Sequence, residues 1–153
     1  MQYFLNAVLY DIIYLSNEKG FSHMRCPVCN NMMIVVERYD VELDYCIDCH
    51  GIWFDFEELK FLSDAMEDVE FEIPSEENIK EVKNSKEKIH RCPRCMSKMK
   101  KIMINGNPPV IDCCPNRHGF WFDSGELGEY IQSNSKIEPK GMIKFLGEVI
   151  KMK

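Results

Sequence analysis

The sequence has no long hydrophobic run and no secretory signal pattern. Its apolar stretch at residues 3–15, YFLNAVLYDIIYL, has no basic residue before it and is interrupted by Asn6 and Asp11. This stretch is also too short to span a bilayer. We therefore expect no transmembrane segment and a reducing, cytoplasmic setting, in which thiols bind metals more often than they form disulfides.

Basic residues are the minority among the charged ones. The chain has 19 Lys and Arg against 25 Asp and Glu, a formal net charge of −6, which argues against a nucleic-acid binder driven by charge alone. Residues 24–68 carry a net charge of −8, whereas residues 89–133 carry +2 and residues 134–153 carry +3. Nucleic acid would therefore have to bind through the second half of the chain and its basic tail.

Cysteine, by contrast, is abundant, with eight residues that fall mostly in CxxC pairs. The stretch YCIDCHGIWFDFEEL at residues 45–59 recurs as CCPNRHGFWFDSGEL at residues 113–127. A CPxC turn precedes each copy and a helical pattern follows it. Segment A (residues 24–68) and segment B (residues 89–133) are therefore predicted to form two similar modules.

Segment A predicts a metal site with four thiolates. Sixteen residues separate its two CxxC turns, which is enough for an antiparallel hairpin that closes a tetrahedral cage. Zinc is expected, and iron in a rubredoxin-like cage is the competing metal. Gly51 is expected to give the second turn its backbone freedom, and His50 to be exposed or to support the ligands. The predicted ligands are Cys26, Cys29, Cys46 and Cys49.

Segment B departs from this pattern at one position, because Arg117 replaces Cys49 and an arginine has no lone pair for a metal. An imidazole reaches farther from the backbone than a thiolate does, so His118 is predicted to complete the site. The predicted ligands are Cys92, Cys95, Cys114 and His118. With both sites filled, the chain would hold two Zn²⁺ ions.

Cys113 is the competing ligand in segment B. It aligns with Tyr45, and on an extended strand its side chain points away from that of Cys114. We therefore expect Cys113 to lie outside the cage. Two alternatives stay open at this point: a site closed through Cys113, and a hairpin that binds no metal.

The expected fold is a small metal-stabilised α+β protein made of two tandem zinc ribbons, each a β-hairpin followed by a short helix. Strands are predicted at residues 32–39, 41–45, 98–104 and 109–112, and helices at 56–69 and 124–133. Asp55 and Asp123 are predicted to be helix N-caps, with Glu58 and Glu126 three residues later. The apolar face of the first helix would carry Leu59, Leu62 and Met66.

The remaining segments are predicted from composition. Residues 69–88 are expected to be a charged linker with a tendency to helix at its end. Residues 134–153 predict a C-terminal amphipathic helix with a basic polar face, which packs on the protein or on a partner, or binds a membrane surface. Residues 1–23 are either a genuine N-terminal helix or an untranslated leader read as coding upstream of Met24.

The pairs Trp53-Phe54 and Trp121-Phe122 follow the two metal turns directly. Two interpretations are open: a stacking platform for bases, and a small core beneath each metal turn. The second is favoured, because modules of this size have few other large apolar groups to bury.

These motifs resemble the transcription-factor-IIB-type zinc-finger family of small prokaryotic proteins. That family has a CPxC turn, a hairpin, a second metal turn followed by Gly-x-Trp-hydrophobic-Asp, and then Glu-Leu. Segment A matches throughout, and segment B matches except at Arg117. The resemblance implies a zinc ribbon and zinc binding, and a likeness of fold alone does not imply a role in transcription.

We expect a non-enzymatic interaction module, since both predicted sites have four protein ligands and leave no position for a reacting water. A protein partner is favoured over nucleic acid. A nucleic-acid-binding transcription factor is one alternative, with a cationic cluster near the second CPxC turn as its contact. A redox or metal-responsive switch is the other, with Cys113 as a spare thiol. The candidate cationic residues are Arg91, Arg94, Lys98, Lys100 and Lys101.

Overall fold

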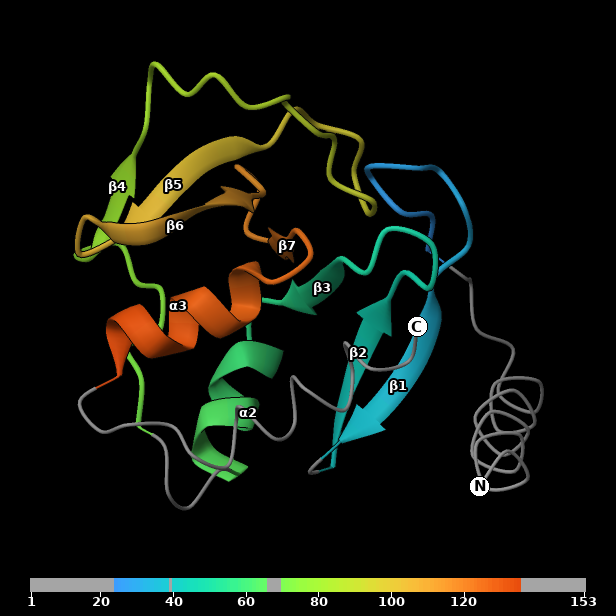
Figure 1. The fold of residues 1–153 in the computed structure, drawn as a ribbon, viewed down its shortest axis with the longest axis horizontal. Helices are drawn as coiled ribbons and strands as arrows, with labels where there is room; N and C mark the ends of the chain where they lie inside the picture. Colours follow the sequence, from blue (N-terminus) through green and yellow to red (C-terminus); the bar gives the residue numbers. More distant parts are fainter. Residues whose placement is uncertain (1–23, 39, 66–69, 136–153) are drawn as a thin grey trace.

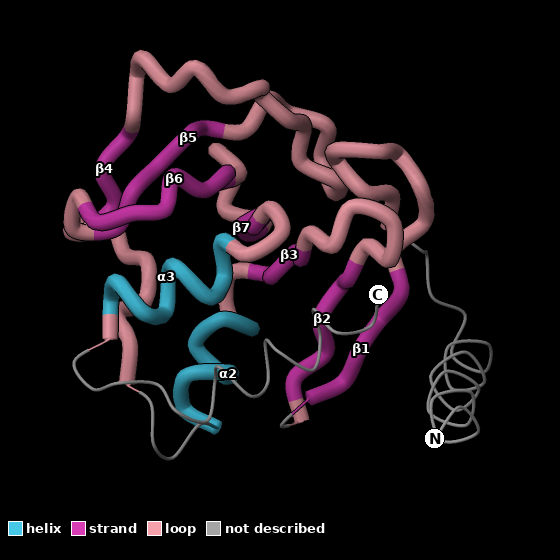
Figure 2. The backbone as a smooth tube through the Cα atoms, viewed as in Figure 1, coloured by secondary structure: helices cyan, strands magenta, loops and turns pink. Residues whose placement is uncertain are grey.

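The computed structural model describes residues 24–38, 40–65 and 70–135 (Figure 1). Its centre is one antiparallel sheet of seven strands in the order β1-β2-β3-β7-β6-β5-β4. Both described helices lie on the same side of this sheet (Figure 2). The elements are β1 (Ile34–Arg38), β2 (Val41–Tyr45), β3 (Ile52–Asp55), α2 (Glu58–Ala65), β4 (Ile79–Glu81), β5 (Lys100–Ile104), β6 (Asn107–Cys113), β7 (Gly119–Phe122) and α3 (Glu126–Asn134).

The predicted α+β character and the four predicted hairpin strands are confirmed, but three strands, β3, β4 and β7, were missed. β3 and β7 contain the tryptophans and pair with each other, so segments A and B form one continuous sheet. In this pairing Trp53 is opposite Trp121, Ile52 is opposite Phe122 and Phe54 is opposite Phe120. The register is symmetric about the Trp53–Trp121 pair and relates the two segments by an approximate twofold axis.

The side chains of β3 and β7 alternate between two cores, as the pleat requires. Phe54 and Phe122 face the helices, where they meet edge-to-face at 5.7 Å between ring centroids. Trp53 and Trp121 face the other way, in a second core that also contains Cys26, Cys46, Cys92 and Cys114. All four rings are fully buried. The core interpretation of these aromatic pairs is therefore confirmed, and a base-stacking platform is excluded.

Two glycines leave room for each tryptophan ring to pack against the other segment. A Cβ added to Gly51 would lie 2.0 Å from the Trp121 ring, and one added to Gly119 would lie 2.8 Å from the Trp53 ring and 2.0 Å from the carbonyl oxygen of Phe54. The expectation that Gly51 supplies backbone freedom is therefore corrected. Its missing side chain makes room for the tryptophan of the other segment.

Both helices begin differently from the prediction. Glu58 accepts a hydrogen bond from the Asp55 N–H at 2.7 Å, and Glu126 accepts one from the Asp123 N–H at 2.8 Å, so the glutamate half of each predicted capping box is present. The aspartates do not cap: the N-cap of α3 is Gly125, without a side-chain hydrogen bond.

The Asp55 carboxylate instead accepts a hydrogen bond from Trp53 Nε1 at 2.9 Å. The Asp123 carboxylate accepts the matching bond from Trp121 Nε1 at 2.8 Å. Each aspartate therefore accepts a hydrogen bond from the indole two residues earlier in its own segment, and not from the N-terminus of the following helix.

Residues 69–88, expected to be a charged linker, contribute strand β4, which pairs with β5 at the edge of the sheet. The expected helical tendency at the end of this segment is wrong. Phe71 is buried in the helix-side core and packs edge-to-face on Tyr130 at 5.8 Å. The buried face of α2 carries Leu59 and Leu62, as predicted.

Several predictions fall on residues outside the described ranges. These are the N-terminal segment 1–23, the C-terminal amphipathic helix beyond residue 135, and Met66 on the first helix. Among the described helices, none has the length and apolar character needed to cross a membrane.

Candidate metal centres

Four similar turns, which we call knuckles 1 to 4, hold the candidate ligands. They span residues 26–31, 46–51, 92–97 and 114–119. In each, the first cysteine donates its N–H to the carbonyl oxygen five residues later, at 2.8–3.0 Å. Knuckles 1 and 2 converge from segment A, and knuckles 3 and 4 from segment B.

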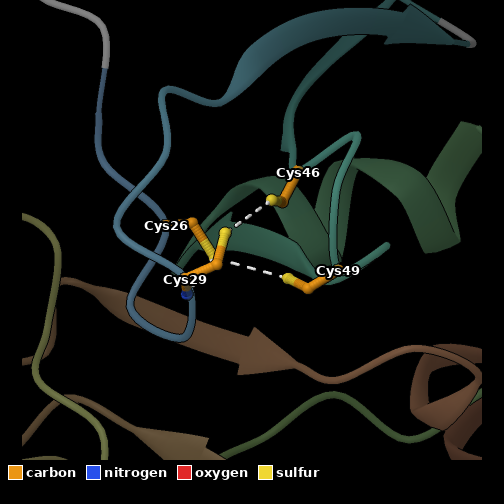
Figure 3. A group of neighbouring side chains, drawn as sticks. All are labelled: Cys26, Cys29, Cys46 and Cys49. Atoms are coloured by element: carbon orange, nitrogen blue, oxygen red, sulfur yellow. Dashed lines mark hydrogen bonds between the residues drawn. The ribbon is translucent and has the colours of Figure 1, made fainter.

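In segment A the four predicted cysteines form one group (Figure 3). The Sγ atoms of Cys26 and Cys49 are 3.4 Å apart, and so are those of Cys29 and Cys46. Zn–S bonds of about 2.3 Å in a tetrahedron would separate the sulfurs by about 3.8 Å. The thiol group therefore fits a zinc-sized ion with a shift of a few tenths of an ångström.

In segment B the predicted set also converges, with the imidazole in the fourth place. His118 Nδ1 lies 3.5 Å from the Sγ of Cys114 and 3.9 Å from that of Cys92. The Sγ atoms of Cys95 and Cys114 are 3.6 Å apart. A zinc tetrahedron with one nitrogen ligand would place N and S about 3.6 Å apart, so this donor set fits the metal too.

The backbone explains why the fourth ligand moves from position 49 to position 118. In knuckles 1, 2 and 3 the residue after the second cysteine is left-handed, and its N–H bonds back to the first cysteine's carbonyl. In knuckle 4 the left-handed residue comes one position earlier, at Arg117 with φ 60°, whose N–H bonds to Cys114 O at 3.1 Å. His118 therefore points toward the cage, whereas its counterpart in knuckle 2, His50, points away from the cage toward Tyr45.

Arg117 has its own contacts outside the cage. Its guanidinium lies 4.9 Å from the centroid of the Phe56 ring and pairs with Glu76 at 2.6 Å. A cation above an aromatic face is attracted by the ring quadrupole. The residue that breaks the CxxC pattern therefore attaches knuckle 4 to segment A.

The electrostatics of the thiols suit a bound cation. Burial raises the pKa of Cys92 to about 12 and that of Cys49 to about 11, so without a cation these thiols stay protonated. Hydrogen bonds from Ser97 and Asn116 lower the pKa of Cys95 to about 5. A metal ion deprotonates its coordinating thiols and replaces those protons.

Polar contacts fasten the paired knuckles to each other. Asn31 in knuckle 1 donates to the Asp48 carboxylate in knuckle 2 at 2.9 Å. At the equivalent place in segment B, Asn116 hydrogen-bonds the Ser97 hydroxyl at 3.1 Å. His50 lies outside its cage, as expected, and its Nδ1 is 2.7 Å from the Tyr45 hydroxyl oxygen.

Cys113 lies on the other side of the sheet from the cage of segment B. It is buried with the helix-side core, whereas Cys114 belongs to the core around the metal ligands. The prediction from strand alternation is therefore confirmed. Burial raises the pKa of the Cys113 thiol to about 12.

A third group of potential ligands was missed in the sequence: His90, Asp112 and Asp123. Lys101 Nζ lies 3.0 Å from Asp112 Oδ2, and His90 Nδ1 is 3.1 Å from the same oxygen. Lys101 also pairs with Glu87 at 3.0 Å. Because the lysine already supplies a cation to the buried carboxylate, we interpret the group as an ion-pair network. Lys101 and Asp112 are cross-strand partners.

The cationic cluster proposed for nucleic acid is mostly neutralised. Arg94, Lys100 and Lys101 form ion pairs, and their respective partners are Asp55, Glu81 and Asp112. Arg91 donates a hydrogen bond to the carbonyl oxygen of Met96 at 2.8 Å. Of the five cations in this cluster, three therefore face carboxylates.

Residues 25–65 match a family model described as transcription factor zinc-finger, of the TFIIB zinc-ribbon type. The match contains all four cysteines of segment A. Segment B lies outside the matched residues. No curated protein and no solved structure matches the chain.

Proposed function

We propose that this protein is a non-enzymatic tandem zinc-ribbon protein that holds two structural zinc ions and serves as an interaction module for a protein partner. One observation carries the proposal. Eight side chains converge into two groups of four around a single core that contains both tryptophans. The match of segment A to a zinc-ribbon family supports zinc as the metal.

The donor sets favour a structural role for the metals. Each cage has four protein donors, which complete a zinc tetrahedron and leave no position for an attacking water. The cages support the ends of the hairpins, where a module of this size buries too little apolar surface by itself. Zinc would therefore contribute folding free energy rather than chemistry.

The alternatives have less support from the geometry. A nucleic-acid contact through segment B would rely on cations of which three are already ion-paired. A thiol switch through Cys113 would need that thiol beside a ligand sulfur, but it is packed in the opposite core. A protein partner is compatible with the acidic charge of segment A, which would repel a polyanion.

Metal content and coordination test the metal assignment. We expect two zinc ions per chain by mass spectrometry of the purified protein, with tetrahedral coordination by X-ray absorption. His118→Ala should lower the content to about one ion, and Cys113→Ser should leave it at two. A single ion in the natural protein, or a loss caused by Cys113→Ser alone, would contradict the assignment.

Binding assays test the interaction. We expect no binding to DNA or RNA that weakens steeply with salt, and in-cell crosslinking should join the protein to a defined protein partner. A Cys46→Ser variant, which disrupts the first cage, should lose those crosslinks. Tight, salt-dependent nucleic-acid binding without protein crosslinks would contradict the proposal.

A further inference from the structure

Knuckles 1 and 3 form the walls of a cleft of about 560 Å³. The two loops come from different segments and lie next to each other beside the sheet (Figure 1). A cleft of this size is within the range that binds small ligands or a few side chains of a peptide. It exists only because β3 and β7 join the two segments into one sheet.

The charge of this cleft is opposite to that of the chain. Three cations line it, Arg25, Lys88 and Arg91, and its lining contains no acidic residue. Among the described residues, none of the three forms an ion pair, whereas the chain as a whole has a net charge of −6. The cleft is therefore a cationic site on an acidic protein.

The two arginines occupy equivalent positions, one residue before the first cysteine of knuckles 1 and 3. Arg25 Nη1 donates to Asn30 O at 3.1 Å, and Arg91 Nη1 donates to Met96 O at 2.8 Å. Each acceptor is the carbonyl of the left-handed residue of its knuckle. The metal turns thus hold both guanidinium groups in place, which reduces the side-chain entropy lost when a ligand binds.

Apolar side chains accompany these cations. Ile89 and Met96 line the cleft and are 57% and 60% exposed, and Met24 lines it as well. Exposed methionine adapts its shape to different partners, and arginine and methionine are both enriched in protein interfaces. The lining therefore suits a ligand that places a carboxylate next to a bulky apolar group.

We propose that this cleft binds a partner peptide in which an acidic residue is flanked by large apolar residues. The proposal rests on the protein-binding function proposed above and adds its location and the chemistry of the partner. The arginines would hold the carboxylate by charge-assisted hydrogen bonds. Ile89, Met96 and Met24 would contact the neighbouring side chains. A nucleic acid fits less well, because segment A carries a net charge of −8 close by.

A defined peptide library tests the proposal on the full-length zinc-loaded protein. The probe is Ac-Gly-Ser-X-Asp-X-Ser-Gly-amide, where X is Leu, Ile, Phe, Met or Trp, and the readout is the NMR signal of isotope-labelled methionine methyl groups. We expect the library to shift Met24 and Met96 but not Met103 on β5. A matched library with Asn in place of Asp should bind at least about tenfold more weakly. Unshifted Met24 and Met96 signals at millimolar peptide would overturn the proposal.

Matched variants locate the contact. Arg25→Gln/Arg91→Gln should weaken peptide binding at least about tenfold. Lys80→Gln/Lys83→Gln, which changes two exposed cations outside the cleft, should change it by less than about twofold. Zinc content and thermal stability should stay those of the natural protein in both. Equal losses in the two pairs would overturn the cleft as the binding site.

Two further measurements separate the other occupants. Stronger binding of single-stranded oligothymidine than of the peptide library, lost in the cleft variant, would assign the cleft to nucleic acid. Met96 shifts that depend on protein concentration alone would assign it to a second copy of the chain. Either result overturns the peptide proposal. In-cell protein crosslinks that lie outside the cleft would overturn it while leaving the proposed function intact.

Discussion

Knuckles 2 and 4 have the same length and the same closing hydrogen bond, yet they present their last ligand from different positions. In knuckle 2 the left-handed residue is His50, which follows Cys49 and points to Tyr45. In knuckle 4 it is Arg117, so the next residue, His118, faces the cage. A shift of the left-handed residue by one position therefore compensates for the lost thiolate. The spacing of a CxxC pattern alone does not describe the site.

The segments also differ in how they neutralise their acidic groups. In segment A, Asp44, Asp55 and Glu58 cluster, and Arg94 of segment B supplies the cation. In segment B the equivalent acids are Asp112, Asp123 and Glu126, and their cation is Lys101 of the same segment. Segment A thus depends on its neighbour for a charge that segment B provides for itself.

Metal removal should have the largest effect on this paired arrangement. A strong chelator should unfold both segments, since a structural zinc contributes about 10–16 kcal/mol in zinc-finger peptides. Because both cages share one core with Trp53 and Trp121, Cys46→Ser should also weaken metal binding in segment B. Far-ultraviolet circular dichroism and zinc titration measure these effects. An unchanged zinc affinity of segment B in the Cys46→Ser protein would mean that the two cages are independent.

The glycine contacts come next in size. Gly51→Ala would place a Cβ 2.0 Å from the Trp121 ring, and we expect a loss of about 3 kcal/mol in the free energy of unfolding. Gly119→Ala should cost as much, for it meets Trp53 and backbone. Gly125 is the control: its Cβ would meet nothing within 4 Å, and only its φ of 87° opposes the change, at about 1 kcal/mol. If urea unfolding shows that Gly125→Ala destabilises the protein more than the other two variants do, close packing of each tryptophan on the glycine of the other segment is contradicted.

Much of each segment could be predicted from its own residues. The hairpin strands follow from apolar runs and turn signals, and the eight ligands follow from aligning the two copies. The pairing of β3 with β7 was missed because each strand pairs with a strand of the other segment. The central pair, Trp53 and Trp121, is 68 residues apart in the chain. β4 was missed because it is a short edge strand whose residues are mostly exposed and charged, so its composition is that of a linker.

The backbone of the knuckles was the other limit. Arginine has no preference for left-handed φ, so nothing in the local sequence places the left-handed residue at Arg117. The predicted aspartate caps failed for a similar reason. An aspartate before a helix can accept from the helix or from an indole two residues earlier, and here a tryptophan needs an acceptor for its buried N–H.

The indole–carboxylate bonds should have an intermediate effect. Asp123→Ala leaves the Trp121 N–H without its acceptor, which should cost about 1–3 kcal/mol. Asp55→Ala should cost more, because it also removes the partner of Arg94. Urea denaturation of both variants, of Arg94→Ala and of Asp55→Ala/Arg94→Ala gives the coupling energy between Asp55 and Arg94. Equal costs for the two aspartates would show that the ion pair between the segments contributes nothing.

The capping glutamates should produce a smaller, pH-dependent effect. Burial and the neighbouring Asp55 and Asp44 raise the pKa of Glu58 from 4.5 to about 7. The folded protein therefore retains this proton more tightly than the unfolded chain, and the stability due to it declines as the pH rises from about 4.5 to about 7. Glu58→Gln keeps an acceptor for the Asp55 N–H without the charge.

The variant should accordingly gain stability relative to the natural protein as the pH rises from about 4.5 to about 7. Unfolding of both proteins at several pH values in excess zinc measures this difference in stability. Both proteins have the same thiol ligands, so the pH dependence of zinc binding cancels when one is subtracted from the other. Glu126→Gln is the matched variant in segment B, where burial, Asp123 and Glu87 raise the pKa of Glu126 to about 7. A difference that stays constant with pH would contradict the shifted pKa values.

The smallest change in stability should come from the turn of knuckle 4, where the result is a change of ligand. Arg117→Cys alone should keep His118 as the fourth ligand, because residue 117 is left-handed and its side chain lies toward Phe56, outside the cage. It should cost about 1 kcal/mol, from the lost cation–π contact and ion pair. Arg117→Cys/His118→Asn should instead adopt the turn of knuckle 2, because asparagine accepts left-handed φ readily. Cobalt substitution distinguishes the outcomes, since a fourth thiolate in place of nitrogen shifts the visible absorption of the metal. A spectrum with four sulfurs from the single variant would mean that the ligand follows the cysteine spacing and not the backbone.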